Sequence, residues 1–171
     1  MNRALILVLI LMSACKQQDR KPVLEFDQAM HYNIQIEDQV LFEIASQGTL
    51  TNKEQLKIDV LVNKKPQNIS DTLFIKDLME IGFTKNTVAI DKLSELRSVF
   101  SNPNEQKTEM NECVKIYRDI LVFKTNNQIT GMAKVCFECR DVQMVNLNPN
   151  SIKSLSDYDY NRLSELLVFV N

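Results

Sequence analysis

The chain has 171 residues, of which 20 are basic and 22 acidic, so its formal charge is −2, and 44% of its residues are hydrophobic. This composition suits one globular domain and excludes a disordered, collagen-like or multi-pass membrane protein. The balanced charge also argues against a nucleic-acid-binding protein. With a single histidine in the chain, any histidine-based catalytic or metal site must use His31.

The N-terminus carries an apolar run that ends at a cysteine. Arg3 precedes nine apolar residues, 4–12, which are too few to span a hydrocarbon core that needs about 20 helical residues. A basic start, an apolar run and two small residues are typical of a secretory signal peptide. Because Cys15 follows the small residues directly, the segment resembles a bacterial lipobox, with Met12 where Leu is more usual. The alternative is a plain secretory signal that a cysteine happens to follow.

We therefore predict a lipoprotein signal peptide over residues 1–14 and lipidation of Cys15, which would anchor the chain to a membrane of the bacterial cell envelope. Cleavage would leave 171 − 14 = 157 residues with a formal charge of 19 − 22 = −3. Residues 15–22 would form the lipidated cysteine and a flexible polar tether, and residues 23–171 a single α+β domain.

Three segments open the predicted domain. Residues 23–36 are expected to be extended, and residues 40–45 could form a helix or a strand. Thr51 and Glu54 have the spacing of a capping box, which predicts a helix after Thr51. The β-branched run 58–62 favours a strand instead, so both alternatives stay open there.

Three more helices are predicted further along. The first begins at Ser70 or Asp71 and ends at Gly82, where a glycine can adopt positive φ. A short extended piece at 87–90 leads to a helix over 91–101 that Asp91 caps, and a last helix covers 157–168 after a cap at Ser156 or Asp157. The apolar stripes expected to be buried are Phe74, Leu78 and Ile81; Leu93, Leu96, Val99 and Phe100; and Tyr160, Leu163, Leu167 and Val170.

The clearest structural prediction is a β-hairpin within residues 113–138. Asn126 and Asn127 tolerate positive φ and lie between two strand-like runs, which predicts a two-residue turn. In that register the numbers of opposed residues sum to 253, so Lys115 faces Glu138 and Asp119 faces Lys134 across the strands. A three-residue loop, with a sum of 252, is the costlier alternative because it moves side chains to the wrong face. We also expect a third strand at 142–147, giving a small C-terminal antiparallel sheet packed against the helices near 91–101 and 157–168.

The register also affects the three remaining cysteines, which are candidates for a disulfide or for thiol chemistry. In the preferred register Cys136 and Cys139 point to opposite faces of an extended strand, and Cys113 opposes Arg140. The 252 register instead allows a disulfide between Cys113 and Cys139. Redox catalysis by the C-x-x-C pair and a zinc site built from the three cysteines and His31 are weaker alternatives, because the pair follows a strand and the spacing matches no standard finger.

No catalytic constellation is recognisable in the sequence, so we expect no enzyme, no cofactor and no metal. His31 is predicted to be a packed or surface histidine rather than a catalytic base. Arg118 lies on an otherwise apolar face, where the stem of an arginine packs while its head reaches water; an anion-binding role is the alternative. Phosphate loops, G-x-S-x-G and H-E-x-x-H are missing from the sequence.

Residues 113–139 resemble a module of small lipoproteins and secreted proteins of the Bacteroidetes. The shared features are a cysteine before an arginine-containing strand, a short turn, and a second strand that ends in C-F-x-C, here residues 136–139. The resemblance implies a family and no activity. Together with the lipobox, it favours a non-enzymatic envelope lipoprotein that binds a protein or a small molecule, or serves a structural role. An envelope thiol protein that uses Cys113, Cys136 and Cys139 for redox or metal chemistry is the alternative.

Overall fold

The structure is a computed structural model that describes residues 24–62, 65–101, 113–146 and 155–168. The predicted signal peptide, Cys15 and the tether lie outside these residues. An α+β fold is confirmed, but the sheet is larger than predicted because two early strands join it. The antiparallel sheet has the order β2-β1-β3-β4-β5. Its strands are β1 Gln28–Asn33, β2 Thr84–Thr87, β3 Asp119–Thr125, β4 Gln128–Cys136 and β5 Asp141–Asn146.

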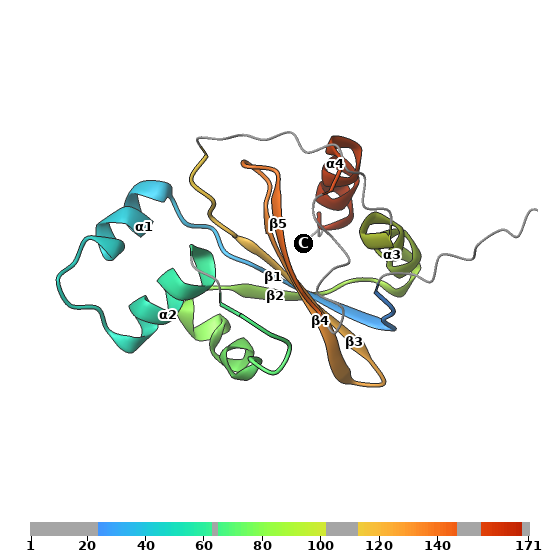
Figure 1. The fold of residues 1–171 in the computed structure, drawn as a ribbon, viewed down its shortest axis with the longest axis horizontal. Coiled ribbons are helices and arrows are strands. Elements are labelled where there is room, and N and C mark those ends of the chain that lie inside the picture. The colour runs from blue at the N-terminus through green and yellow to red at the C-terminus, as the bar shows by residue number, and fades with distance from the viewer. Residues whose placement is uncertain (1–23, 63–64, 102–112, 147–154, 169–171) are drawn as a thin grey trace, which may run out of the picture.

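Helices cover both faces of the sheet (Figure 1). One face packs against α3 Leu93–Ser101 and α4 Asp157–Leu166, as predicted for the C-terminal helices. The other face packs against α1 Asp38–Ala45, α2 Asn52–Leu61 and two 3₁₀ helices, η1 Leu73–Asp77 and η2 Met79–Ile81. Side chains alternate between two separate apolar cores, because successive residues of a strand point to opposite faces.

The capping box is confirmed at the start of α2. The Thr51 hydroxyl accepts a hydrogen bond from the Glu54 amide at 3.3 Å, and the Thr51 amide donates to Glu54 Oε2 at 2.8 Å. The helix runs through Leu61 although its last turn is β-branched. Buried contacts of Val60 and Leu61 with the sheet therefore outweigh a weak strand propensity.

The segment after residue 70 differs from the predicted single helix. It forms η1 and η2, although the predicted stripe of Phe74, Leu78 and Ile81 is buried as expected. Gly82 ends the segment at φ 105°, and the Phe83 amide donates to the Leu78 carbonyl at 3.0 Å, which confirms the glycine C-terminus.

The two later helices agree with their predicted positions in most respects. Ser156 caps α4 by accepting a hydrogen bond from the Asp159 amide at 3.1 Å, as predicted. Asp91 is not a cap, because it lies inside a 3₁₀ turn, η3 Ile90–Lys92, that precedes α3. The predicted stripes on α3 and α4 are buried, apart from Val170, which lies outside the described residues.

The hairpin turn is confirmed, but the register is wrong beyond the first two pairs. Asn126 and Asn127 have φ of 51° and 63°, and Thr125 pairs with Gln128. A bulge at Thr130 then puts one additional residue into β4, so Phe123 pairs with Gly131 and the sum of opposed numbers becomes 254. Every later partner therefore moves by one residue, and neither the 253 nor the 252 register describes the strands beyond the bulge.

The predicted cross-strand charge pairs are overturned as a result. Lys134 faces Ile120, while Asp119 faces Val135 and points to the opposite side of the sheet. Lys115 precedes β3 and forms its ion pair with Asp141 instead of Glu138.

Candidate functional site

One face of the sheet changes from apolar to polar along its strands. Beneath α3 and α4 it presents buried apolar side chains such as Ala29, Leu121 and Phe123. Two residues further along β1, and at the start of β3, the same face presents His31 and Asp119, both of which are buried. Asn33 on β1 and its register partner Thr84 on β2 add polar side chains to this end. Asn86 on β2, the register partner of His31, adds another.

A hydrogen-bonded chain organises this polar end. His31 Nε2 lies 2.7 Å from Asp119 Oδ1, and Asn33 Nδ2 donates to the same oxygen at 2.9 Å. Gln35 Nε2 donates to Asn33 Oδ1 at 2.9 Å, which fixes the orientation of the Asn33 amide. Within the described part of the chain, no hydrogen bond reaches the second carboxylate oxygen, Asp119 Oδ2. One oxygen of the carboxylate is therefore fully engaged and the other is available to a ligand.

A pocket of about 640 Å³ opens over these residues, and we call it the His31 pocket. One wall comes from the polar ends of β1, β2 and β3. The other wall comes from Phe137, in the turn after β4, and from the C-terminal end of α4. The lining residues are His31, Asn33, Gln35, Thr84, Asn86, Asp119, Phe137, Ser164, Leu167 and Val168. This size is in the range of small-molecule sites, which combine apolar walls with a few placed polar groups.

The opposite face of the sheet contains a buried lysine. Lys134 Nζ donates to the carbonyls of Val60 at 2.7 Å and Lys65 at 3.0 Å, and lies 4.5 Å from the centre of the Tyr117 ring. Burial lowers the pKa of Lys134 to about 7. The carbonyls lie at the C-terminal end of α2 and just after it, where a cation is favourable. Lys134 therefore connects β4 to the end of this helix.

Tyr117 continues this connection. Its amide donates to the Leu61 carbonyl at 2.8 Å, and its hydroxyl donates to Asp141 Oδ2 at 2.6 Å. Lys115 Nζ contacts the other oxygen of Asp141 at 2.6 Å. Burial, and next the hydrogen bond to Asp141, raise the pKa of Tyr117, because both disfavour the phenolate. The segment before β3 is thus held to α2 on one side and to β5 on the other.

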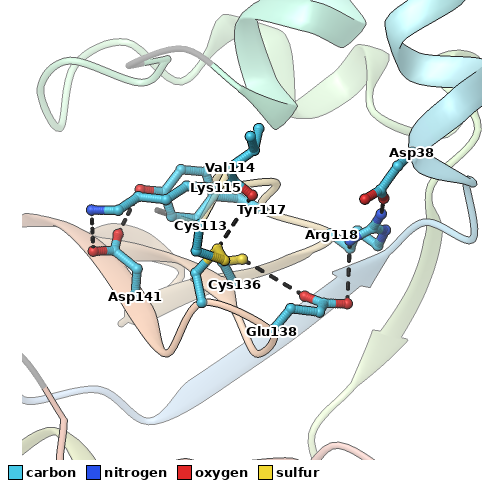
Figure 2. The surroundings of a disulfide bond; sticks show 10 residues. Asp38, Cys113, Val114, Lys115, Tyr117, Arg118, Cys136, Glu138 and Asp141 are labelled. Atoms are coloured by element: carbon cyan, nitrogen blue, oxygen red, sulfur yellow. Dashed lines mark hydrogen bonds and ion pairs between the residues drawn. A yellow bond between two sulfur atoms is a disulfide. The ribbon is translucent and has the colours of Figure 1, made fainter. Parts of the chain in front are cut away.

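A disulfide joins Cys113 to Cys139, with 5.6 Å between their Cα atoms (Figure 2). It ties the segment before β3 to the turn between β4 and β5. The bond does not require the 252 register that the sequence analysis linked to it. Because β3 begins only at Asp119, the segment that carries Cys113 lies outside the paired strands. The C-x-x-C pair is therefore not a dithiol in this structure.

The third cysteine, Cys136, is a free thiol packed in one cluster with the disulfide and Tyr117. Its Sγ lies 3.6 Å from Glu138 Oε2 (Figure 2). Burial raises the pKa of the Cys136 thiol, since it disfavours the charged thiolate. As predicted, Cys136 lies on the same face of β4 as Lys134. The four residues of the zinc alternative do not meet in this structure, because two of its cysteines are bonded to each other and His31 lies on the other face of the sheet.

Arg118 is held by two side chains and a backbone carbonyl of the protein itself. Its guanidinium contacts the carboxylates of Asp38 and Glu138, and its Nε donates to the Ile36 carbonyl at 3.1 Å (Figure 2). The side chain is only 17% exposed, so the predicted packing of its stem agrees with the structure, but its head pairs with protein carboxylates instead of reaching water. Arg118 connects the start of α1 to the turn after β4.

The sequence predictions found part of these sites. The sequence predicts His31 to be a packed or surface histidine, and the preferred register pairs its partner Asp119 with Lys134 instead of Val135. Asn33, Thr84 and Asn86 carry no sequence motif. A signal does exist in β1, where His31 and Asn33 continue the alternation that begins with the buried Ala29.

The described residues contain neither a membrane-spanning helix nor a cluster of metal ligands. Nowhere in ranges 24–62, 65–101, 113–146 and 155–168 is a helix both long and apolar enough to cross a membrane. The same ranges contain no cluster of three or more His, Cys, Asp or Glu side chains that could hold a metal ion.

Comparison of the chain with family models, with curated proteins and with solved structures found no match.

Proposed function

We propose that the protein is a lipid-anchored envelope lipoprotein whose domain binds a small ligand in the His31 pocket without catalysing a reaction. The observation that carries the binding function is the polar end of the sheet face. The polar side chains at this end lie on the same face of the sheet as the apolar residues that α3 and α4 cover. Here, however, the side chains line a pocket. Buried polar groups are costly unless they are hydrogen-bonded, so such a cluster is typical of a binding site.

Binding without catalysis is supported by the position of His31. Its side chain is 4% exposed, and its Nε2 is engaged with Asp119 at 2.7 Å. A general base must reach the proton that it abstracts from a substrate. Here the imidazole lies beneath the pocket surface and orients the carboxylate, which is the more accessible of the two groups at 13% exposure.

The anchor is supported by the signal-peptide pattern, the cysteine after it and the resemblance of residues 113–139 to Bacteroidetes lipoproteins. It is tested by metabolic labelling of the full chain with tritiated palmitate, compared with the Cys15→Ser variant. We expect labelling and globomycin-sensitive processing of the parent chain, and neither in the variant. Palmitate labelling that persists after Cys15→Ser would reject the anchor.

The binding function is tested by a ligand screen on the full lipoprotein in detergent. Thermal unfolding is recorded with a library of small polar compounds, because a ligand that binds only the folded state raises the midpoint. Compounds that shift the wild type are repeated on Asn86→Ala, which removes a pocket amide from an edge strand, and on Asn161→Ala, an exposed amide of α4 outside the pocket. We expect the shift to be lost only in Asn86→Ala; an equal shift in both variants would place the ligand elsewhere.

Thiol chemistry is a second candidate, favoured by one observation: the Cys136 thiol packs in the same cluster as the Cys113–Cys139 disulfide. The raised pKa of Cys136 opposes it, because the thiolate is the reactive form. Mass spectrometry of the native protein, alkylated without reduction, distinguishes a structural disulfide from a thiol function. A single Cys113–Cys139 bond supports a structural disulfide, and a Cys136–Cys139 bond would support the thiol function.

A further inference from the structure

We propose that the ligand of the His31 pocket is an uncharged, polyhydroxylated molecule, that is, a sugar or a related polyol. This inference rests on the proposed binding function and names the chemical class of its ligand. Three properties of the pocket support it: its charge, its hydrogen-bonding groups and the contrast between its two walls.

The charge of the pocket favours neither an anion nor a cation. Of the ten described residues that line it, only His31 and Asp119 can carry a charge. The Asp119 carboxylate already receives two N–H donors on Oδ1, from His31 and Asn33. An anion would meet this carboxylate with no lysine or arginine among those lining residues to hold it. A cation would meet a carboxylate whose charge the two donors partly compensate.

The hydrogen-bonding groups match hydroxyls. Amides and hydroxyls each donate and accept, as the hydroxyls of a polyol do. Asp119 Oδ2 adds an open acceptor, which a ligand hydroxyl can fill as a donor. The hydrogen bonds between Gln35, Asn33 and Asp119 hold this wall in place before a ligand arrives, which reduces the entropic cost of binding. The amide and hydroxyl side chains that line the pocket are Asn33, Gln35, Asn86, Thr84 and Ser164.

The two walls differ in polarity. The strand wall carries the amides and Asp119, while the opposite wall carries Phe137, Leu167 and Val168 with one hydroxyl, that of Ser164. A sugar ring has the same asymmetry, since its hydroxyls lie around the edge and its C–H groups form apolar faces. A ring bound between these walls would bury a C–H face against Phe137 and direct hydroxyls to Asp119 and Asn86.

The test is isothermal titration calorimetry of the full lipoprotein in detergent with three classes of probe at millimolar concentration. The neutral probes are glucose, galactose, mannose, N-acetylglucosamine and their disaccharides; putrescine serves as the cation and succinate as the anion. We expect binding of at least one sugar, weakened about 10-fold or more by Asp119→Asn, because a hydrogen bond to a charged group is lost. We expect a smaller loss in Asn86→Ala and none in the matched Asn161→Ala.

Each outcome decides the inference. Sugar binding that is weakened in Asn86→Ala and unchanged in Asn161→Ala supports it, and this pair keeps the test valid if Asp119→Asn fails to fold. Binding of putrescine or succinate alone, with the same dependence on Asn86, overturns the ligand class and leaves the binding function standing. Sugar binding that is unchanged in Asn86→Ala and Asp119→Asn, or no binding of any probe, overturns both.

Discussion

His31 Nε2 and Asp119 Oδ1 lie 2.7 Å apart across β1 and β3, although the two residues are 88 positions apart in the chain. The contact exists because β1 pairs with β3 and places both side chains on the face that α3 and α4 cover. It is the centre of the polar end of that face.

Asp119→Ala should lower the free energy of unfolding by about 1–3 kcal/mol, because it removes the acceptor of the buried His31 side chain and of the part-buried Asn33 amide. Urea unfolding followed by circular dichroism measures the change. The control is Glu165→Ala, an exposed carboxylate of α4, which should stay within about 0.5 kcal/mol of the wild type. Equal stability of the two variants would contradict a buried His31–Asp119 contact.

Lys134 should make the protein more stable as pH rises from about 7 towards 10. Its pKa is lowered to about 7 in the folded state and is 10.5 when unperturbed, so between these values the unfolded chain binds more protons. The free energy of unfolding therefore rises with pH, by about 1.4 kcal/mol for each unit by which the folded-state pKa lies below the unfolded-state pKa.

The measurement is urea unfolding at a series of pH values, with Lys134→Met as the comparison. The variant should lose the rise between pH 7 and 10. Both proteins should lose stability above pH 10, because burial raises the pKa values of Tyr117 and Tyr160 in the folded state and the unfolded chain releases their protons first. A rise of equal slope in Lys134→Met would show that another group causes it.

Loss of the disulfide should destabilise the domain by about 3.5 kcal/mol, since Cys113 and Cys139 close a loop with a sequence separation of 26. The double variant Cys113→Ser/Cys139→Ser is compared with wild type in urea unfolding without reductant. Addition of reductant should lower the stability of the wild type to that of the variant and leave the variant unchanged. If reductant has no effect on the wild type, the bond does not constrain the unfolded chain.

The Cys136 thiol should resist labelling in the native protein. Its side chain is 1% exposed and burial raises its pKa, so little thiolate reaches solvent at neutral pH. We expect Ellman's reagent to react with Cys136 only after denaturation, measured on a Cys15→Ser chain so that no other free thiol contributes. The control is Cys15→Ser/Cys136→Ser, which should not react in either state. Rapid native labelling of Cys136 would instead favour the thiol function.

Gly82→Ala should cost about 1–2 kcal/mol, because φ of 105° is strained for a residue with a Cβ atom. Gly48→Ala is a matched control, since its added Cβ would meet nothing within 4 Å. Thermal unfolding should therefore separate the two variants. A similar midpoint for both would show that the end of η2 can change its backbone conformation freely.

Local features were predictable from the sequence because neighbouring residues determine them. The capping box at Thr51, the Ser156 cap, the turn at Asn126 and Asn127, and the C-terminus at Gly82 all depend on contacts within a few residues. The apolar stripes were predictable for the same reason, since one helical period decides which side chains share a face. The signal peptide and Cys15 lipidation stay predictions, because those residues lie outside the structure.

The candidate site could not be predicted in the same way, because its residues meet only through strand pairing. One additional residue at Thr130 moves Lys134 to one face of the sheet and leaves Asp119 on the other, and no local pattern signalled that bulge. The cysteines show the same dependence, since Cys113 reaches Cys139 only because the chain before Asp119 leaves the ladder.

The sequence by itself determined the class of fold, the caps at Thr51 and Ser156, the end at Gly82 and the hairpin turn, through interactions that act over a few residues. Tertiary structure alone decided which polar side chains share a face and form the His31 pocket. The physical reason is the two-residue period of a strand: a shift by one position reverses the direction of every side chain, while the local sequence stays the same.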